Sequence, residues 1–359
     1  MFTELKILNF RGIKNLEITN LNKINIFVGS NGSGKSTVLD AIFISINPNN
    51  TQIISNTNLF RNIEPNNFDY LLTYFHFFNL KKEIEIILKN NNTRMIKITP
   101  LISKDFNIVS FEKEFADSVI SDKKNIESIN SGSDAKSMIV GLKTEFEVKN
   151  KKYNSSFIFQ PQGLFKFNED ENFIPDISGH YHNSQTLTSA NLANSFGQLV
   201  RDKKKNDIVK FLKLFEPEIS EINMDESKNI VVNDDRFDKA VNINLYGSGL
   251  TKALHIYMNS LLEGNNIVLI DEIENGLHYT NQQILWEAIL KILENSDKQF
   301  FITTHSYEIV KYLVQILEKR NLLQILSLFR LEQMNNQIEA ISYSKEEIKY
   351  TILGSFEVR

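Results

Sequence analysis

The order of apolar and polar residues predicts strands at the start of this chain, then a loop and a helix. Residues 2–10 and 16–28 alternate or run apolar, as β-strands do, with a break at Arg11-Gly12, and they predict two or three strands. Residues 47–67 are rich in Asn, Thr and Ser and predict a loop or a short irregular helix. Between these segments, apolar residues recur at helical spacing at Val38, Leu39, Ile42, Phe43 and Ile46.

The next part of the chain has the pattern of an antiparallel meander. We expect its sheet to end in the stretch from Phe157 to Gly163. His76 lies in an aromatic run, so we expect a core or sheet residue and not a ligand. The polar residues 103–140 predict an insertion that is partly helical. Runs that favour strands lie at 70–78, 83–89, 94–99, 142–149 and 153–160.

The following segment has weaker patterns. Residues 164–189 predict an extended loop, in which His180 and His182 form an H-x-H pair. Such a pair can bind a metal, but no third ligand is evident, so we expect solvated loop residues. Residues 189–216 predict helices. The basic run RDKKK within them, residues 201–205, is usually a solvated helix face, and a contact for nucleic acid or a partner is the alternative.

The last third of the chain alternates strands and helices. Residues 219–245 predict short strands, after which a Gly-Ser-Gly turn at 247–249 leads into a helix. The elements predicted after it are a strand at 267–270, a helix at 281–294, a strand at 299–304, a hairpin of 325–331 and 337–343, and a helix that starts with the capping box Ser344–Glu347.

Composition narrows the class of protein. The chain has 359 residues, enough for about two domains or one large domain with insertions, and its 42% hydrophobic content supports a substantial core. A net charge of −4 argues against a surface coated with positive charge, although it permits a local basic groove. The absence of cysteine excludes disulfides and thiolate metal sites and suits the cytoplasm. No apolar run has the roughly 20 residues of a membrane helix, and no signal peptide is evident.

The loop before the first predicted helix has a phosphate-binding pattern. The stretch GSNGSGKST has the form G-x-x-x-x-G-K-S from Gly29 to Ser36. Its glycines permit backbone conformations that a Cβ would block, so N–H groups and the helix N-terminus can bind phosphate oxygens. Lys35 can reach the β- and γ-phosphates, and the Ser36 hydroxyl can ligate Mg²⁺.

Two later strands end in residues that suit nucleotide hydrolysis. Asp271 follows a buried strand and can hold Mg²⁺, directly or through water, and Glu272 can orient and deprotonate an attacking water. His305 follows a second strand, and it can lie beside the γ-phosphate because ligands collect at the carboxyl ends of strands in α/β folds. The turn at 247–249 can direct N–H groups at an anion, which alone is a weak signal.

Together these motifs resemble the ABC-type ATPase head, and more narrowly the soluble branch that includes RecF, SMC and the OLD-family ATPases. The resemblance rests on GSNGSGKST, YGSGLTKAL, VLIDEIENGLH and ITTHS, with NFRGIKN at the start, and covers about residues 1–46 and 240–310. It implies an α/β P-loop NTPase with a mixed sheet, an antiparallel β subdomain and an inserted, partly helical arm. The implied segments are a lobe with the phosphate loop (1–60), the β subdomain (61–163), a loop and helical arm (164–238) and a second lobe (239–359). Neither the coiled coils of SMC proteins nor the Toprim nuclease domain of OLD proteins is evident, so we expect a stand-alone head.

The resemblance also implies roles for individual residues. Glu272 is the implied catalytic base, and His305 is the implied switch histidine. Ser248 and Gly249 are the implied contact with the nucleotide of the opposite subunit, and residues 275–278 are the implied D-loop at the dimer interface. The groups implied near Mg²⁺ are Ser36, Asp271 and either Gln160 or Gln162. The groups implied at ATP are Arg11, Asn31, Gly32, Ser33, Gly34, Lys35, Ser36 and Thr37.

The implied function is an ATP-binding and hydrolysing switch that forms a head-to-tail homodimer, or a higher homo-oligomer, through its ATP sites. No effector chemistry is evident elsewhere, so we expect a separate effector protein, such as a nuclease or toxin of a bacterial anti-phage system. The alternative is a RecF-like ATPase that binds DNA during repair, which the negative net charge disfavours. The departure of YGSGL from the transporter motif LSGGQ disfavours a transporter subunit, and we expect no membrane partner.

Overall fold

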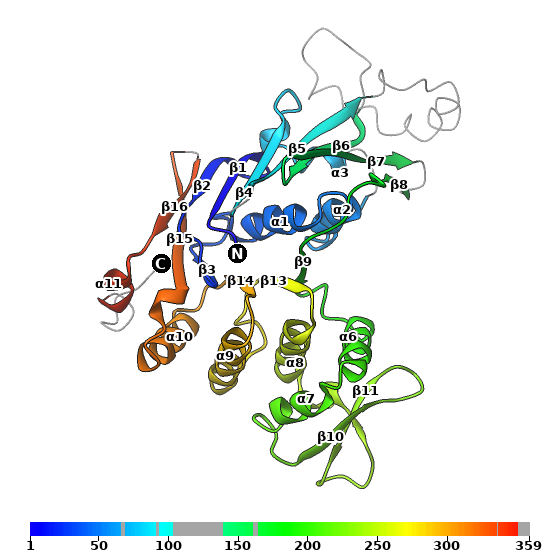
Figure 1. Cartoon of the computed structure of the whole chain (residues 1–359), viewed down its shortest axis with the longest axis vertical. Coiled ribbons are helices and arrows are strands. Elements are labelled where there is room, and N and C mark those ends of the chain that lie inside the picture. The colour runs from blue at the N-terminus through cyan, green and yellow to red at the C-terminus, as the bar shows by residue number, and fades with distance from the viewer. Residues whose placement is uncertain (66–68, 91–92, 103–138, 161–163, 336, 351–359) are drawn as a thin grey trace.

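The computed structural model describes residues 1–65, 69–90, 93–102, 139–160, 164–335 and 337–350. In it, two large sheets enclose a layer of helices, and further helices cover the outer face of one sheet (Figure 1). Helices α1 (Lys35–Ile46) and α2 (Gln52–Leu59) lie between the sheets. The outer helices are α8 (Ser248–Leu261), α9 (Tyr279–Glu294) and α10 (Tyr307–Lys319).

The sheet between the two helical layers is mixed. Over the described residues its order is β16 (Gln337–Ser342), β15 (Leu326–Met334), β3 (Ile24–Val28), β14 (Gln299–Thr303), β13 (Asn265–Ile270) and β9 (Ser178–His182). Neighbouring strands run parallel, except that β16 is antiparallel to β15. On β14, Phe300 and Ile302 face the core under the outer helices, whereas Phe301 faces the core around α1. Burial on both faces explains why these strands are apolar without alternation.

The second large sheet is antiparallel throughout. In the part of the chain that the structure describes, its order is β2 (Ile13–Ile18), β1 (Glu4–Phe10), β4 (Ile84–Lys89), β5 (Thr93–Ile102), β6 (Ile139–Val148), β7 (Lys151–Gln160) and β8 (Leu164–Asn168). Since β1 and β2 belong to this sheet and β3 to the other, the first strands of the chain connect both layers.

A smaller unit packs against α8. Helices α6 (Ser189–Arg201) and α7 (Lys205–Leu212) precede a small sheet of β10 (Ile219–Met224), β11 (Ile230–Asp234) and β12 (Val241–Asn242). The ring of Phe211 on α7 stacks on that of Tyr257 on α8, with 4.0 Å between centroids. Within the basic run 201–205, Arg201 ends α6, Lys205 begins α7, and residues 202–204 join the two helices. The last residues of the predicted strands at 219–245 form a 3₁₀ turn, η4 (Ile243–Tyr246).

The predicted strand at residues 70–78 is wrong. The structure has helix α3 (Asp69–Leu72) and the 3₁₀ turn η1 (His76–Phe78) instead. Tyr70 and Tyr74, four positions apart, are both buried beside α2, where the Tyr70 hydroxyl donates to Ser55 O over 2.7 Å. A run that is apolar at nearly every position does not distinguish a helical period from a strand period. His76 is buried as expected, but in a turn and not in a sheet.

The predicted loop at residues 164–189 is wrong in part, because two strands lie within it, although residues 169–177 and 183–188 belong to neither a helix nor a strand. Strand β8 continues the antiparallel sheet beyond Gly163, and β9 forms an edge of the mixed sheet. His180 and His182 therefore lie in a strand, paired with Val268 and Ile270, and His182 is only 2% exposed. They are not solvated loop residues. The sequence of β9, SGHYH, lacks the apolar alternation by which a strand is predicted.

Lowering the pH from 7.5 to 5.0 is expected to destabilise the protein through its buried histidines. Burial lowers the pKa of His255, on α8, from 6.5 to about 4, and burial also lowers the pKa of His182 far below its ordinary value. Between these two pH limits the unfolded chain binds more protons than the folded one, so stability falls as the pH falls. For His255 the expected loss at pH 5.0 is about 2 kcal/mol. Urea unfolding at both pH values measures it, and His255→Gln should lose less; an equal loss in the variant would contradict the assignment.

The predictions around the phosphate loop are confirmed. Three strands precede that loop, α1 follows it, and the C-terminal hairpin consists of β15 and β16. Helix α11 (Lys345–Ile348) begins with the predicted capping box of Ser344 and Glu347. The predicted loop or short helix at 47–67 contains the two-turn helix α2. The insertion predicted at 103–140 lies outside the described residues except for its last two positions, which begin β6.

Candidate functional site

A cavity of about 710 Å³ opens where β3, β13 and β14 end. Its walls come from the phosphate loop and the turn after β1, with further residues from other parts of the chain: Arg61, Ile63, Thr73, Phe75, Phe77, Phe78, Glu272, His305 and Ile338. Because the carboxyl ends of parallel strands meet at one edge of the sheet, this is where ligands bind in α/β folds. The volume lies within the roughly 300–1,000 Å³ that small-molecule sites span.

The phosphate loop has the conformation that its glycines predict. Gly29, Gly32 and Gly34 have φ angles of 142°, 79° and 93°, where a side chain would be strained. A Cβ on Gly34 would also lie 2.8 Å from Cδ1 of Ile338. Helix α1 begins directly after Gly34, so its first N–H groups have no partner within the helix and are free to bind an anion.

Lys35 crosses the phosphate loop. Its Nζ donates to Gly29 O and to Ser30 O, each over 2.9 Å. Burial lowers the pKa of Lys35, and the carboxylates of Asp271 and Glu272 oppose this shift. Lys35 lines the cavity together with Asn31, Gly32, Gly34, Ser36 and Thr37. Ser33, also predicted to contact nucleotide, is 1% exposed and is not among the described residues that line the cavity.

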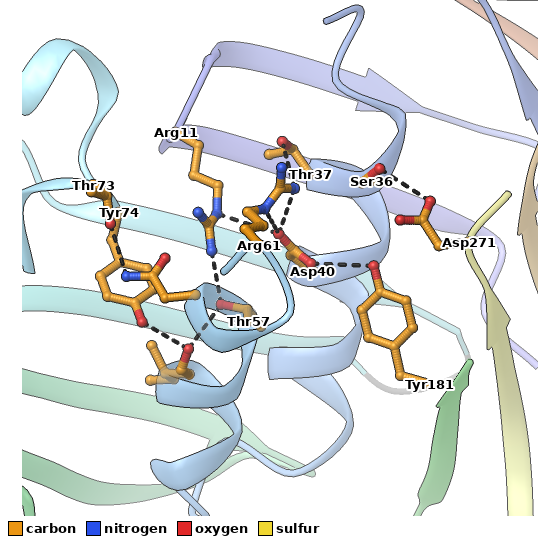
Figure 2. A network of polar contacts seen from close by, with 12 residues as sticks. Arg11, Ser36, Thr37, Asp40, Thr57, Arg61, Thr73, Tyr74, Tyr181 and Asp271 are labelled. Atoms are coloured by element: carbon orange, nitrogen blue, oxygen red, sulfur yellow. Dashed lines mark hydrogen bonds and ion pairs between the residues drawn. The ribbon is translucent and has the colours of Figure 1, made fainter. Parts of the chain in front are cut away.

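Ser36 and Asp271 are brought together from 235 positions apart in the sequence. Ser36 Oγ donates to Asp271 Oδ1 over 3.0 Å (Figure 2), and Thr303 Oγ1 donates to the same oxygen over 2.6 Å. Burial raises the pKa of the Asp271 carboxyl, and the hydrogen bonds from Thr303 and Ser36 oppose this shift. A half-buried carboxylate beside a hydroxyl supplies the oxygen ligands that Mg²⁺ prefers, so these residues fit that ion.

Glu272 lines the cavity from a strained turn. Its φ is +49°, an unusual value for a residue with a side chain, and its N–H donates to Thr303 Oγ1 over 2.8 Å. Its carboxylate accepts a hydrogen bond from Asn275. Lys252, from α8, donates to Glu272 O over 2.7 Å and to Asn275 O over 3.1 Å. Contacts from both β14 and α8 therefore fix the turn that carries Glu272.

Two residues of this region were missed by the sequence reasoning. Lys252 is buried, and burial lowers its pKa to about 8. Its signal in the sequence is a lysine within the apolar side of a helix. Glu274 accepts from Thr304 Oγ1 and from the N–H of His305, each over 2.6 Å, and so it connects the acidic turn to the end of β14. His305 itself lines the cavity.

Asp40 pairs with two arginines at the edge of the cavity (Figure 2). It lies on α1, is 1% exposed, and accepts from Arg61 over 2.7 Å, with Arg11 Nε 3.3 Å away. Both arginines line the cavity. Arg11 also donates to Thr57 Oγ1 over 2.9 Å, and burial lowers its pKa while the Asp40 charge raises it. Arg61 and Asp40 were not predicted, because the sequence does not show that residues 11, 40 and 61 meet.

The remaining predicted residues lie elsewhere. Ser248 and Gly249 form the first turn of α8 and contact Gly276, and neither is among the described residues that line the cavity. Gln160 is the last residue of β7, with its side chain outside what the structure describes. Gln162 falls outside the described residues altogether.

The fold and the phosphate-loop cavity define the class of protein: the chain is a P-loop ATPase with the α/β fold expected above, a fold that it shares with an Smc head. More particularly, it belongs to the family described as "AAA domain, putative AbiEii toxin, Type IV TA system", whose model matches residues 24–311.

The comparisons with individual proteins agree with this assignment. The chain is 24% identical to an "ATP/GTP phosphatase" of Helicobacter pylori, over 98% of this chain and 97% of that protein. A shorter match, over 16% of this chain and 4% of the other protein, is 34% identical to the human "ATP-binding cassette sub-family A member 6". An Smc head solved in complex with the C-winged helix domain of ScpA shares the fold, with a TM-score of 0.51, 12% identity, and coverage of 96% of this chain and 97% of that one. None of the helices within the described ranges is long and apolar enough to span a membrane.

Proposed function

We propose that this protein is an ATP-operated switch that dimerises head-to-tail around two ATP molecules and controls a separate effector protein. The observation that supports the proposal is a division of the site. The cavity is lined by the phosphate loop, Glu272 and His305, whereas Ser248 and Gly249, at the start of α8, are not among the described residues that line it. A second copy that presents this turn would complete the site, since helix N-termini bind anions.

The residues of the cavity divide the chemistry of hydrolysis between them. Backbone N–H groups of residues 31–37 and the Lys35 amine bind the β- and γ-phosphates. Ser36 and Asp271, with Gln160 or Gln162 as the expected third group, would hold Mg²⁺, which neutralises phosphate charge when bound. Glu272 orients the attacking water and accepts its proton, and His305 responds to the γ-phosphate.

The proposed output is control of a nuclease or toxin in anti-phage defence, in the manner of the OLD-like branch. The family description, which mentions a toxin–antitoxin system, supports this direction. The RecF-like alternative gains less support. Lys204 donates to Leu261 O and to Glu263, and Lys205 donates to Glu221, so half of the basic run's four cations are already engaged. The alternative therefore stays secondary.

The mass in solution of Glu272→Gln tests the dimer. Loss of the proposed base should preserve bound ATP, so the mass is expected to double when ATP and Mg²⁺ are added and to stay at one chain without them. Light scattering after size-exclusion chromatography measures it.

A second substitution separates the proposed interface from nucleotide binding. Adding Ser248→Arg to Glu272→Gln places a bulky cation on the turn, and this double variant should bind ATP yet remain at the mass of one chain. A Glu272→Gln protein that binds ATP without a change in mass would refute the dimer. A chain that binds no ATP would refute the proposed function.

A further inference from the structure

The aromatic turn η1 contributes to the lining of the cavity and is unusual in two ways. Phe77 and Phe78 line the cavity although they are 79% and 56% exposed, so the fold alone does not require their rings. Both residues are also left-handed, with φ of 49° and 56°. Each such residue costs about 1–3 kcal/mol and persists where the surrounding structure enforces it, which is common at ligand sites.

Contacts with residues 10 and 11, at the end of β1, hold this turn in place. The N–H of Arg11 donates to Tyr74 O over 2.8 Å, and Phe10 and Phe75 form a β-bridge. The His76 ring bonds Arg11 O through Nδ1 over 2.9 Å, and the Phe77 ring lies 4.3 Å from the His76 ring. Figure 2 shows Tyr74 next to Arg11. The exposed rings are therefore fixed to the turn after β1, which also lines the cavity.

Five of the residues that line the cavity form a mainly apolar group. Ile63, Thr73 and Phe75 line it together with Phe77 and Phe78. Thr73 has the one polar side chain among these residues, and its hydroxyl already donates to Tyr70 O over 2.7 Å and accepts from Asn58 over 2.9 Å. These described side chains thus offer aromatic faces to a ligand but no free hydrogen-bonding group that could distinguish one base edge from another.

We propose that the base of the bound nucleotide stacks on Phe77 and Phe78, and that the site accepts adenine and guanine nucleotides about equally. The inference rests on the proposed function, because the phosphates must occupy the phosphate loop for the base to reach η1 in the same cavity. Aromatic stacking tolerates any base with a large π-face. Discrimination between the two purines requires hydrogen bonds to their edges, which these side chains do not supply.

Equilibrium binding of three probes tests this inference: the β,γ-imido analogues of ATP and GTP, and inorganic tripolyphosphate, all with Mg²⁺. The wild-type chain is expected to bind the two analogues within about threefold of each other. Phe77→Ala/Phe78→Ala should weaken both by about 5- to 150-fold, the range for loss of one stacked base, and leave tripolyphosphate binding unchanged.

Three further variants make the result specific. Phe237→Ala removes a ring that is 53% exposed and outside the cavity lining, and should change nothing. Phe77→Gly/Phe78→Gly permits the left-handed backbone and should match the alanine variant. Phe77→Tyr/Phe78→Tyr retains the rings and should bind like the wild type.

Each contrary outcome is decisive. Unchanged analogue affinity in the alanine and glycine variants, an equal loss of tripolyphosphate binding, or a tenfold preference of the wild type for one purine overturns the inference. So does loss of the ATP-dependent dimer with normal nucleotide affinity, which would make the rings a subunit interface. If the wild-type chain binds none of the three probes, the proposed function fails as well.

Discussion

Replacing Glu272 by glutamine is expected to lower the rate of ATP hydrolysis by about 10²- to 10⁴-fold, the usual contribution of a general base. The amide has nearly the shape of the carboxylate but does not accept the proton of the attacking water. The contacts that set the backbone of this turn come from Thr303 and Lys252 and do not involve the replaced group. ATP affinity should therefore change little. Phosphate release in single-turnover experiments measures the rate.

The matched control for this prediction is Glu226→Gln, an exposed carboxylate in the turn between β10 and β11, which should hydrolyse ATP at the wild-type rate. If Glu272→Gln retains hydrolysis within tenfold of wild type, Glu272 is not the base. Glu274, two residues further along, is the next carboxylate to test, although its bonds to residues 304 and 305 favour a role in positioning.

Replacing Asp40 by asparagine is expected to destabilise the protein by about 3–5 kcal/mol, because it removes one partner of a buried ion pair and leaves the other uncompensated. Asp40 is 1% exposed, and the side chain of Arg11 is 8% exposed. Asparagine preserves the volume, so lost packing does not explain the result. Arg61, with a side chain 32% exposed, can regain water and contributes less to the loss. Urea unfolding monitored by circular dichroism measures the change.

Glu17→Gln serves as the control for Asp40. Glu17 faces Lys6 across 3.9 Å at the surface, where ion pairs contribute little, so its loss should lie within the error of the measurement. A small effect at Asp40 would mean that Arg11 finds another partner or water. A normal stability with lost ATP binding would place the role of Asp40 in aiming the arginines at the nucleotide.

The sequence predicted the cavity residues best where a chemical motif is formed by residues close together in the sequence. The phosphate loop requires glycines at fixed spacing between a strand and a helix, so Lys35 and Ser36 could be placed without knowledge of the rest of the fold. Asp271 and Glu272 could be predicted for a similar reason, because a buried strand that ends in carboxylates is a local pattern. The structure joins the two motifs through the Ser36–Asp271 hydrogen bond.

What the sequence did not reveal depends on contacts between distant segments. The residues next to Arg61 in the sequence are those of an ordinary surface segment. Only the packing of α2 onto α1 brings Arg61 to Asp40. The edge strand β9 was not predicted, because its own sequence is polar. Its extended conformation is instead accompanied by pairing with β13. The rings of Phe77 and Phe78 were assigned to a strand, and their exposure arises from a left-handed backbone that no local pattern indicated.

The position of β3 affects how the protein can be made in the cell. This strand is buried on both faces, and its two neighbours, β14 and β15, begin only at Gln299 and Leu326. During synthesis this apolar strand therefore leaves the ribosome early, and it has neither of these neighbours until β14 and β15 have also been made. Unpaired apolar strands are prone to aggregate, so slow translation or truncation after α9 should make the product dependent on chaperones. The same order means that a nascent chain cannot close its nucleotide cavity before Ile338 has been added.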